Sequence, residues 1–264
     1  MPTAPEGTPC WADAMFPDFE AAKRFYGELF GWTFGEAAAE FGQYTQAYVG
    51  DRAVAALSPR QEGSDTPPAW NLYLATPDAA ATAARIREHG GEVLVDPMRV
   101  ADFGTMVVAR DPSGVHFSAW QPGTHEGFGV TGRPGSYAWA DLCTREVAKA
   151  DAFFPAVFPF GVRRLDQEEV DFRLWDVGGD PVLGRMAMGS DFPPDVPPYL
   201  NVHFAVGNVD AALTTVDGLG GRLLYGPMDS PFGRFATVSD QQGAVFTVID
   251  PETRVGEVPP FVTA

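Results

Sequence analysis

Apolar and polar residues between positions 10 and 34 follow two periods in succession. From Trp11 to Phe16 the side chains alternate, as they do along a β-strand with two different faces. After Asp18, apolar residues recur at the spacing of a helix that packs on a sheet: Ala22, Phe25, Tyr26 and Leu29. Asp18 is placed to cap the start of this helix, and Gly31 to end it. The pattern predicts a strand, a turn and a helix.

The same pattern returns in the second half of the chain. Trp11 and Asp13 correspond to Trp139 and Asp141, both at a spacing of 128 residues. Residues 70–98 match residues 200–228 at a spacing of 130. Self-similarity at a fixed period predicts a duplicated architecture. We therefore expect a first domain at 1–123, a Gly-rich linker at 124–135 and a second domain at 136–264.

Each predicted domain divides into two similar modules. Residues 8–58 and 69–121 each contain a strand, a helix and further short strands. The turn at 111–114, with the sequence DPSG, joins the last two strands of the first domain as a hairpin. The acidic run at 166–171 predicts a solvated hairpin. The chain is therefore expected to be an α+β protein built from four βαβββ modules.

Charge and composition narrow the partners of the protein. The formal net charge is −17, which argues against nucleic acid and anionic membranes, because both require a basic face. No apolar run is long enough for a membrane span, and the N-terminal residues lack the pattern of a signal peptide. The two cysteines, Cys10 and Cys143, fit a reducing compartment. We expect a cytoplasmic protein.

Two motifs carry a resemblance to a known family. Residues 18–32 read D-x-x-x-A-x-x-F-Y-x-x-x-F-G-W, and residues 111–114 read D-P-x-G ahead of a last strand. Together with the four modules, they resemble the vicinal oxygen chelate superfamily, which includes glyoxalase I, extradiol dioxygenases and bleomycin-resistance proteins. The chain looks similar to its tandem two-domain actinobacterial members. The resemblance covers nearly the whole chain and implies two glyoxalase-like domains with cup-shaped mixed sheets.

The resemblance also implies where a metal would bind. Metal-dependent members place His, Gln or Glu on the first and last strands of each module. The matching positions here hold other residue types, namely Trp11, Asn71, Ser118, Trp139, Asn201 and Thr247. The two remaining positions fall near Ala55 and Leu183, where no carboxylate or imidazole stands. We therefore expect no metal and no other cofactor.

Strand alternation then predicts which side chains face each cup. The first cup is expected to present Trp11, Asp13, Met15, Asn71, Tyr73, His116, Ser118 and Trp120. The second is expected to present Trp139, Asp141, Cys143, Asn201, His203, Thr247 and Ile249. Phe103 and Phe232 lie in equivalent loops near the two mouths. A mainly aromatic lining with a few polar groups suits a flat apolar ligand.

Several of these residues have a structural interpretation beside the functional one. Trp11 and Trp139 either fill space or stack on a ligand. Asp13 and Asp141 are either bound by an Arg or backbone N–H, or they orient a ligand, because an inward carboxylate is costly unless paired. His116 and His203 act either as acid or base, or as structural hydrogen-bonding groups. Cys143 has no evident activating partner, so nucleophilic catalysis is not expected.

Two functions therefore stay open. One is a metal-independent binding protein for a flat aromatic or polycyclic molecule, such as an antibiotic, that sequesters it, confers self-resistance or presents it to a biosynthetic partner enzyme. The other is a metal-independent lyase, isomerase or hydrolase in which Asp141 and His203 form an acid–base pair. The sequence is compatible with a monomer or a homodimer.

Overall fold

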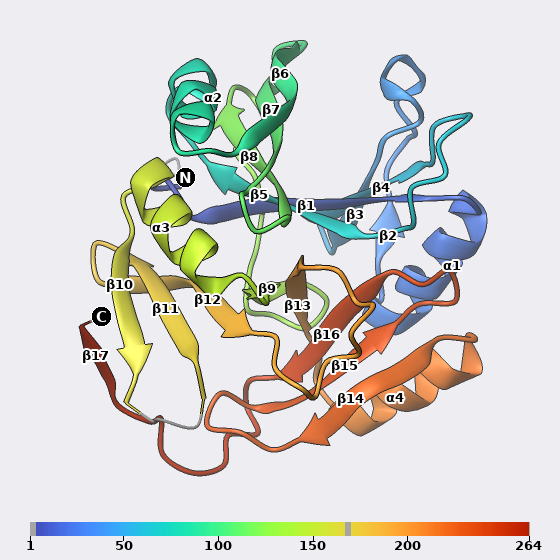
Figure 1. The fold of residues 1–264 in the computed structure, drawn as a ribbon. Helices are drawn as coiled ribbons and strands as arrows, with labels where there is room; N and C mark the ends of the chain where they lie inside the picture. The colour runs from blue at the N-terminus through green and yellow to red at the C-terminus, as the bar shows by residue number, and fades with distance from the viewer. Residues whose placement is uncertain (1–3, 167–169, 264) are drawn as a thin grey trace.

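The computed structural model describes residues 4–166 and 170–263, which form two mixed β-sheets with helices packed against them (Figure 1). Of the predicted hairpin at 166–171, residues 167–169 lie outside the described residues, and strands flank it on both sides. The α+β class and the tandem glyoxalase-like arrangement are confirmed. Within the described ranges, none of the helices combines the length and apolar character needed to cross a bilayer.

The first domain contains an eight-stranded sheet in the order β2-β3-β4-β1-β5-β8-β7-β6. Its strands are β1 (Pro9–Phe16), β2 (Thr33–Phe34), β3 (Thr45–Val49), β4 (Arg52–Pro59), β5 (Trp70–Ala75), β6 (Glu92–Val100), β7 (Gly104–Arg110) and β8 (His116–Pro122). Its helices are α1 (Phe19–Phe30), α2 (Ala79–Glu88) and the short 3-10 helix η1 (Ala39–Phe41).

The second domain contains a nine-stranded sheet in the order β14-β15-β16-β13-β9-β12-β11-β10-β17. Its strands are β9 (Tyr137–Thr144), β10 (Gly161–Leu165), β11 (Phe172–Val177), β12 (Asp180–Ala187), β13 (Tyr199–Ala205), β14 (Arg222–Met228), β15 (Arg234–Ser239), β16 (Val245–Asp250) and β17 (Phe261–Thr263). Its helices are α3 (Val147–Val157) and α4 (Val209–Gly218).

Strand pairing repeats in all four modules. The first strand of each module lies parallel to its last strand, in the pairs β1–β4, β5–β8, β9–β12 and β13–β16. The two modules of a domain join through their first strands, which are antiparallel: β1 with β5, and β9 with β13. Each sheet is therefore completed within its own domain, and its centre consists of the strands that carry the predicted site residues.

Side-chain chemistry explains where the helices begin. Asp18, Asp78 and Asn208 each accept a hydrogen bond from the backbone N–H three residues later, which caps α1, α2 and α4. Gly31 ends α1 with φ 70°, a conformation that strains residues with a Cβ. The corresponding Glu146 makes no side-chain cap on α3. Three of the four α-helices in the described ranges thus start on local signals that the sequence displays.

The main hydrophobic core continues from one domain into the other. Tyr26 on α1 is buried, and its hydroxyl donates a hydrogen bond to Asp240 Oδ2 at 3.0 Å across the domain boundary. Trp70 donates from Nε1 to the same hydroxyl at 3.2 Å. The Phe30 ring lies 5.1 Å from that of Phe204 on β13. Because these buried groups come from both halves, the domains are packed against each other through a shared core.

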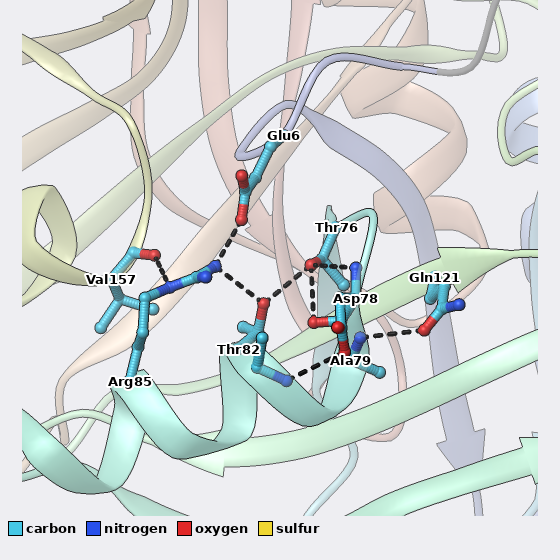
Figure 2. A network of polar contacts seen from close by, with 9 residues as sticks. Glu6, Thr76, Asp78, Ala79, Thr82, Arg85, Gln121 and Val157 are labelled. Atoms are coloured by element: carbon cyan, nitrogen blue, oxygen red, sulfur yellow. Dashed lines mark hydrogen bonds and ion pairs between the residues drawn. The ribbon is translucent and has the colours of Figure 1, made fainter.

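A second interdomain contact involves α2 and α3 (Figure 2). Arg85 donates from Nε to the carbonyl oxygen of Val157, at the end of α3, over 2.8 Å. The same guanidinium donates to Thr82 Oγ1 at 3.0 Å and forms an ion pair with Glu6. One side chain therefore joins the N-terminal segment and two helices from different domains.

The segment 124–135, which the sequence identifies as a linker, contains no helix or strand and packs along the first sheet. The backbone N–H of Phe128 donates to Cys10 O, and that of Gly129 to Ala53 O, both over 2.7 Å. Gly127 has φ 110°, and a Cβ added there would lie 2.4 Å from Cys10 O. A residue larger than glycine would push this segment off β1.

Candidate functional site

Each sheet has a face turned away from the main core, and the predicted site residues of the central strands lie on these two faces. On β1, Ala12 and Ala14 enter the main core, whereas Trp11 belongs to a separate cluster on the opposite face. We call the first face the first cup, defined by Trp11, Asp13, Tyr44, Asn71 and Tyr73. We call the second face the second cup, defined by Trp139, Asp141, Phe172, Asn201 and His203.

Asp13 is the centre of a closed hydrogen-bond network in the first cup. Its Oδ2 accepts from the Tyr44 hydroxyl at 3.0 Å and the Tyr73 hydroxyl at 2.8 Å. Its Oδ1 accepts from Asn71 Nδ2 at 3.2 Å. Trp11 Nε1 in turn donates to the Tyr44 hydroxyl at 2.8 Å. The partner of Asp13 is therefore a set of side chains, not the Arg or backbone N–H that the sequence suggested.

The protonation states of this network follow from its burial. Burial raises the pKa of Asp13, and the bonds from Tyr73, Asn71 and Tyr44 oppose that rise. Burial, reinforced by the charge of Asp13, raises the pKa of both tyrosines well above the usual value. Tyr44 and Tyr73 thus remain hydroxyl donors. The tyrosine and asparagine donors of the first cup are directed at one carboxylate and are already used.

The segment 124–135 also covers the first cup. The His125 ring meets Trp11 edge-on with ring centroids 4.4 Å apart, and Trp120 Nε1 donates to the His125 carbonyl at 2.9 Å. Phe128 packs on Trp11 at 5.6 Å. Trp11 keeps only 3% of its surface exposed. Trp11 and Trp120 therefore pack against the protein's own chain in the first cup.

The second cup holds a different set of contacts around the equivalent carboxylate. Asp141 Oδ2 lies 3.1 Å from His203 Nε2, and Oδ1 accepts from Trp139 Nε1 at 2.9 Å. Sheet register shows what has changed, because His203 stands where the first cup has Tyr73 and Phe172 where it has Tyr44. Both tyrosine hydroxyls are therefore missing. The structure brings together Asp141 and His203, the two residues that the sequence placed on one face.

Two buried polar atoms beside this pair have no hydrogen-bond partner among the described residues. They are Asn201 Oδ1 and His203 Nδ1. Asn201 uses its Nδ2 to donate to Thr247 Oγ1 at 2.9 Å. When Nε2 of His203 carries the proton facing Asp141, Nδ1 presents a lone pair. The second cup therefore offers two unused acceptors, on residues that are 7% and 8% exposed.

Gly184 on β12 allows Asp141 to take this position. A Cβ at Gly184 would lie 2.0 Å from Asp141 Oδ1 and 2.7 Å from the Phe172 ring. Parallel pairing aligns Gly184 with Asp141, as it aligns Ala56 with Asp13 in the first domain. Because Gly184 lacks the methyl group that Ala56 has, the carboxylate of Asp141 can lie directly against the sheet. Sequence reasoning missed Tyr44, Phe172 and Gly184; the alignment of the two repeats was the signal that could have found them.

Aromatic side chains extend the second cup toward β14. Pairing of β15 with β16 places Phe235 next to Ile249 and Thr237 next to Thr247, all on the cup face. Tyr225 on β14 is 53% exposed, and its ring lies 6.3 Å from that of Phe235. Trp139 is partly buried, in contrast to Trp11. The second cup therefore combines polar groups on its central strands with an accessible aromatic wall.

The remaining predicted site residues lie at the edges of the cups or, in the case of Cys143, are not activated for nucleophilic chemistry. His116 is exposed at the start of β8, and burial of part of its ring followed by the charge of Arg110 lowers its pKa. Phe103 and Phe232 are 42% and 48% exposed in their loops. Met15, expected in the first cup, is 47% exposed. Cys143 faces the second cup, but burial raises the pKa of its thiol, which disfavours the nucleophilic thiolate.

Two solvent-open hollows of about 270 and 420 Å³ lie outside both cups. The smaller is formed by the β6–β7 turn and the end of β8. The larger lies between the 111–114 turn and the start of α3, where Arg110 pairs with Glu92 and Lys149 pairs with Glu146. These two ion pairs engage the charged ends of Arg110 and Lys149 in the larger hollow. The unused hydrogen-bonding capacity described above belongs to the second cup.

Four repeated modules and two carboxylate-centred cups define a protein of the glyoxalase type. The family model of the Glyoxalase/Bleomycin resistance protein/Dioxygenase superfamily matches residues 11–118. The chain belongs to this superfamily, and its relatives extend the match over both domains. It is 36% identical to the anthracycline biosynthesis protein DnrV of Streptomyces peucetius, over 92% of this chain and 93% of that protein.

A second relative covers the same range, and a solved structure shares the fold. The anthracycline biosynthesis protein DauV of Streptomyces sp. strain C5 is 34% identical, with the same coverage of 92% and 93%. Among solved structures, the Mn(II)-bound glyoxalase from Novosphingobium aromaticivorans superposes with a TM-score of 0.63 and 17% identity. The superposition covers 97% of this chain and 88% of that one. At this identity the likeness shows the shared fold.

The residues of this chain do not fit the divalent metal that such a fold can hold. An indole N–H is a donor only, and Trp11 and Trp139 stand at the first-strand positions. Asn71 uses both its Nδ2 and its Oδ1 within the first cup, whereas in the second cup only Oδ1 of Asn201 is unused. Within the described part of the chain, no three His, Cys, Asp or Glu side chains gather where they could hold a metal ion. The residues at these positions therefore do not form a ligand set for a divalent metal.

Proposed function

We propose that this protein binds a flat, polycyclic aromatic molecule in its second cup, without a metal, and serves the biosynthesis of such a natural product. The names of DnrV and DauV connect those relatives to anthracyclines, which carry fused flat rings with hydroxyl groups. Such a molecule matches an aromatic wall and hydrogen-bond acceptors. Sequestration and presentation to a partner enzyme are both uses of the same binding site.

The unused acceptors, Asn201 Oδ1 and His203 Nδ1, carry this proposal. A buried polar atom without a partner costs about 1–3 kcal/mol, so a ligand hydroxyl that reaches it recovers that free energy. Trp139 and Tyr225 supply aromatic surface on the same face. In the first cup, the equivalent carboxylate has its own donors and the chain covers Trp11. The second cup therefore offers the better ligand site.

Fluorescence titration with an anthracycline aglycone tests the proposal. We compare Trp139→Phe with Trp11→Phe, a matched change at the equivalent position of the first domain. We expect the first substitution to weaken binding by roughly tenfold or more and the second to leave it nearly unchanged. Absence of binding by the unmodified protein, or equal sensitivity of the two variants, contradicts the proposal.

The contact between Asp141 and His203 favours an enzyme as the second candidate. A carboxylate hydrogen-bonded to one imidazole nitrogen fixes the tautomer and leaves the other nitrogen as a base. His203 Nδ1 meets the second condition. The pair could then remove a proton from a bound ligand and return it at another atom, as an isomerase requires.

Turnover and binding must be measured on the same variants to separate the two functions. The aglycone is incubated with the protein and analysed by mass spectrometry, and affinity is measured in parallel for Asp141→Asn and His203→Gln. Tyr73→Phe is the matched control in the first cup. Loss of turnover with binding retained supports the enzyme. Loss of binding without any chemical change in the ligand supports the binding protein.

A further inference from the structure

Given the proposed function, on which this step rests, we infer that Phe261 on the C-terminal strand β17 is a further ligand-contacting residue of the second cup. β17 pairs with β10 and gives the second sheet a ninth strand, at the end of the sheet opposite β14 (Figure 1). The backbone N–H of Asp166 also donates to Pro260 O at 3.0 Å. The end of the chain is therefore held on the sheet that forms the second cup.

Phe261 lies on the cup face of this sheet. Its ring meets the Phe172 ring edge-on, with centroids 6.2 Å apart. Phe172 in turn reaches the centre of the cup, because a Cβ at Gly184 would lie 2.7 Å from its ring and 2.0 Å from Asp141 Oδ1. Both phenylalanines are partly buried, so each ring keeps some accessible surface. Two aromatic rings thus extend from the Asp141 carboxylate toward the edge of the sheet.

The C-terminal segment takes a different route from its counterpart in the first domain. Residues 122–130 and 251–259 correspond at a spacing of 129. In the first domain this segment packs Phe128 on Trp11. In the second domain Glu257 stands at the position of Phe128 and is exposed. The C-terminal segment thus places no aromatic ring on the centre of its cup and brings one to the edge of the sheet instead.

The order of the two rings bears on the size of the ligand. A ligand hydroxyl at the Asp141–His203 pair leaves the attached ring beside Phe172, and Phe261 lies one ring further out. Aromatic side chains that follow one another in this way suit stacked or edge-on contact with fused rings. Phe261 is therefore expected to add affinity for a molecule with several fused rings.

Phe261→Ala tests this contact, and Val262→Ala is its matched control. Val262 is the next residue on β17, and alternation along the strand turns its side chain to the opposite face. Affinity for an anthracycline aglycone is measured by fluorescence titration. We expect Phe261→Ala to weaken binding roughly threefold to tenfold through the lost aromatic contact, and Val262→Ala to leave it nearly unchanged. Urea denaturation checks that both variants remain folded.

Hydrogen exchange of the backbone amides provides a second measurement that needs no substitution. A ligand that contacts Phe261 also stabilises the docking of β17, because the two equilibria are linked. Saturating aglycone should therefore slow amide exchange in β17 roughly threefold or more, and leave exchange in the connector at 124–135 unchanged.

The outcomes separate the contact with Phe261 from the proposed function. If the unmodified protein does not bind the aglycone, the proposed function is wrong and the contact falls with it. If Trp139→Phe weakens binding but Phe261→Ala and Val262→Ala have equal effects, the ligand site stands and Phe261 is not part of it. Unchanged amide exchange in β17 with bound aglycone leads to the same conclusion.

Discussion

His203 Nε2 lies 3.1 Å from Asp141 Oδ2, at the position where Tyr73 donates its hydroxyl to Asp13 at 2.8 Å in the other domain. The duplicated carboxylate has thus kept its place while its partner has changed from a phenol hydroxyl to an imidazole, which has a second ring nitrogen. This single exchange gives the two cups different capacities. Because the domains are duplicated, most variants in one domain have a matched control in the other.

Phe172→Tyr should make the hydrogen bonding around Asp141 in the second cup more like that around Asp13 in the first. The new hydroxyl stands where Tyr44 donates to Asp13, so we expect it to donate to Asp141 and compete with His203. Aglycone affinity should fall by roughly threefold to tenfold. Calorimetric titration measures it, with Tyr44→Phe as the control that leaves affinity unchanged. An increase in affinity for Phe172→Tyr would contradict this account.

Tyr26→Phe should weaken the junction of the two domains. It removes the donor to buried Asp240 and the acceptor for Trp70 Nε1 without changing the packing of the ring. We expect a loss of about 1–3 kcal/mol in the free energy of unfolding, measured by urea denaturation. Tyr48→Phe, which removes a partly buried bond to Gln46, should cost less. Equal losses for Tyr26→Phe and Tyr48→Phe would mean that the interdomain hydrogen bond stabilises the protein no more than the bond between Tyr48 and Gln46 does.

Arg185→Met should be the most destabilising of these substitutions. Arg185 is fully buried on β12 and pairs with Asp151 through Nε at 2.9 Å and through its second terminal nitrogen at 3.0 Å. Removing it leaves a largely buried carboxylate underpaired, at a cost of about 3–5 kcal/mol. Arg164→Met breaks an exposed 3.8 Å pair with Asp166 and should cost under about 1 kcal/mol. Similar unfolding midpoints for the two variants would refute the prediction.

His125 should make stability depend on pH. Burial lowers its pKa in the folded protein, so the unfolded chain binds the proton more readily and stability is lost as pH falls through the usual histidine range. We expect His125→Gln to lessen the loss between about pH 7 and pH 5, measured by urea denaturation at each pH. The exposed His89→Gln is the control. The prediction fails if both variants keep the slope of the unmodified protein.

Local patterns predicted the fold because they act over short distances. The alternation around Trp11 and Asp13, and the capping residues Asp18 and Asp78, each determine an element from neighbouring residues. The repeat then arranged these elements into two domains. It also placed Asp141 and His203 on one face, since both stand on first strands of modules that pair with each other.

The chemistry of the site was harder to predict from the sequence because it depends on contacts between strands that are distant along the chain. Tyr44 follows η1 and reaches Asp13 only after β3 has paired with β4. In the sequence Gly184 is an ordinary glycine of a strand, and only the structure shows that Asp141 lies against it. His125 lies in a Gly-rich stretch whose composition indicates a connector, and composition carries no information about the surface on which such a stretch lies.

The packing of residues 125–128 on β1 makes the two halves of this protein unequal as independent pieces. A second half beginning after residue 135 would keep every side chain of its own cup. A first half ending at residue 123 would lose the cover on Trp11 and expose an indole that the intact chain keeps dry. Residues 125–128 thus occupy the part of the first cup where a ligand would bind. A small molecule that binds in the first cup has to displace this segment of the protein's own chain.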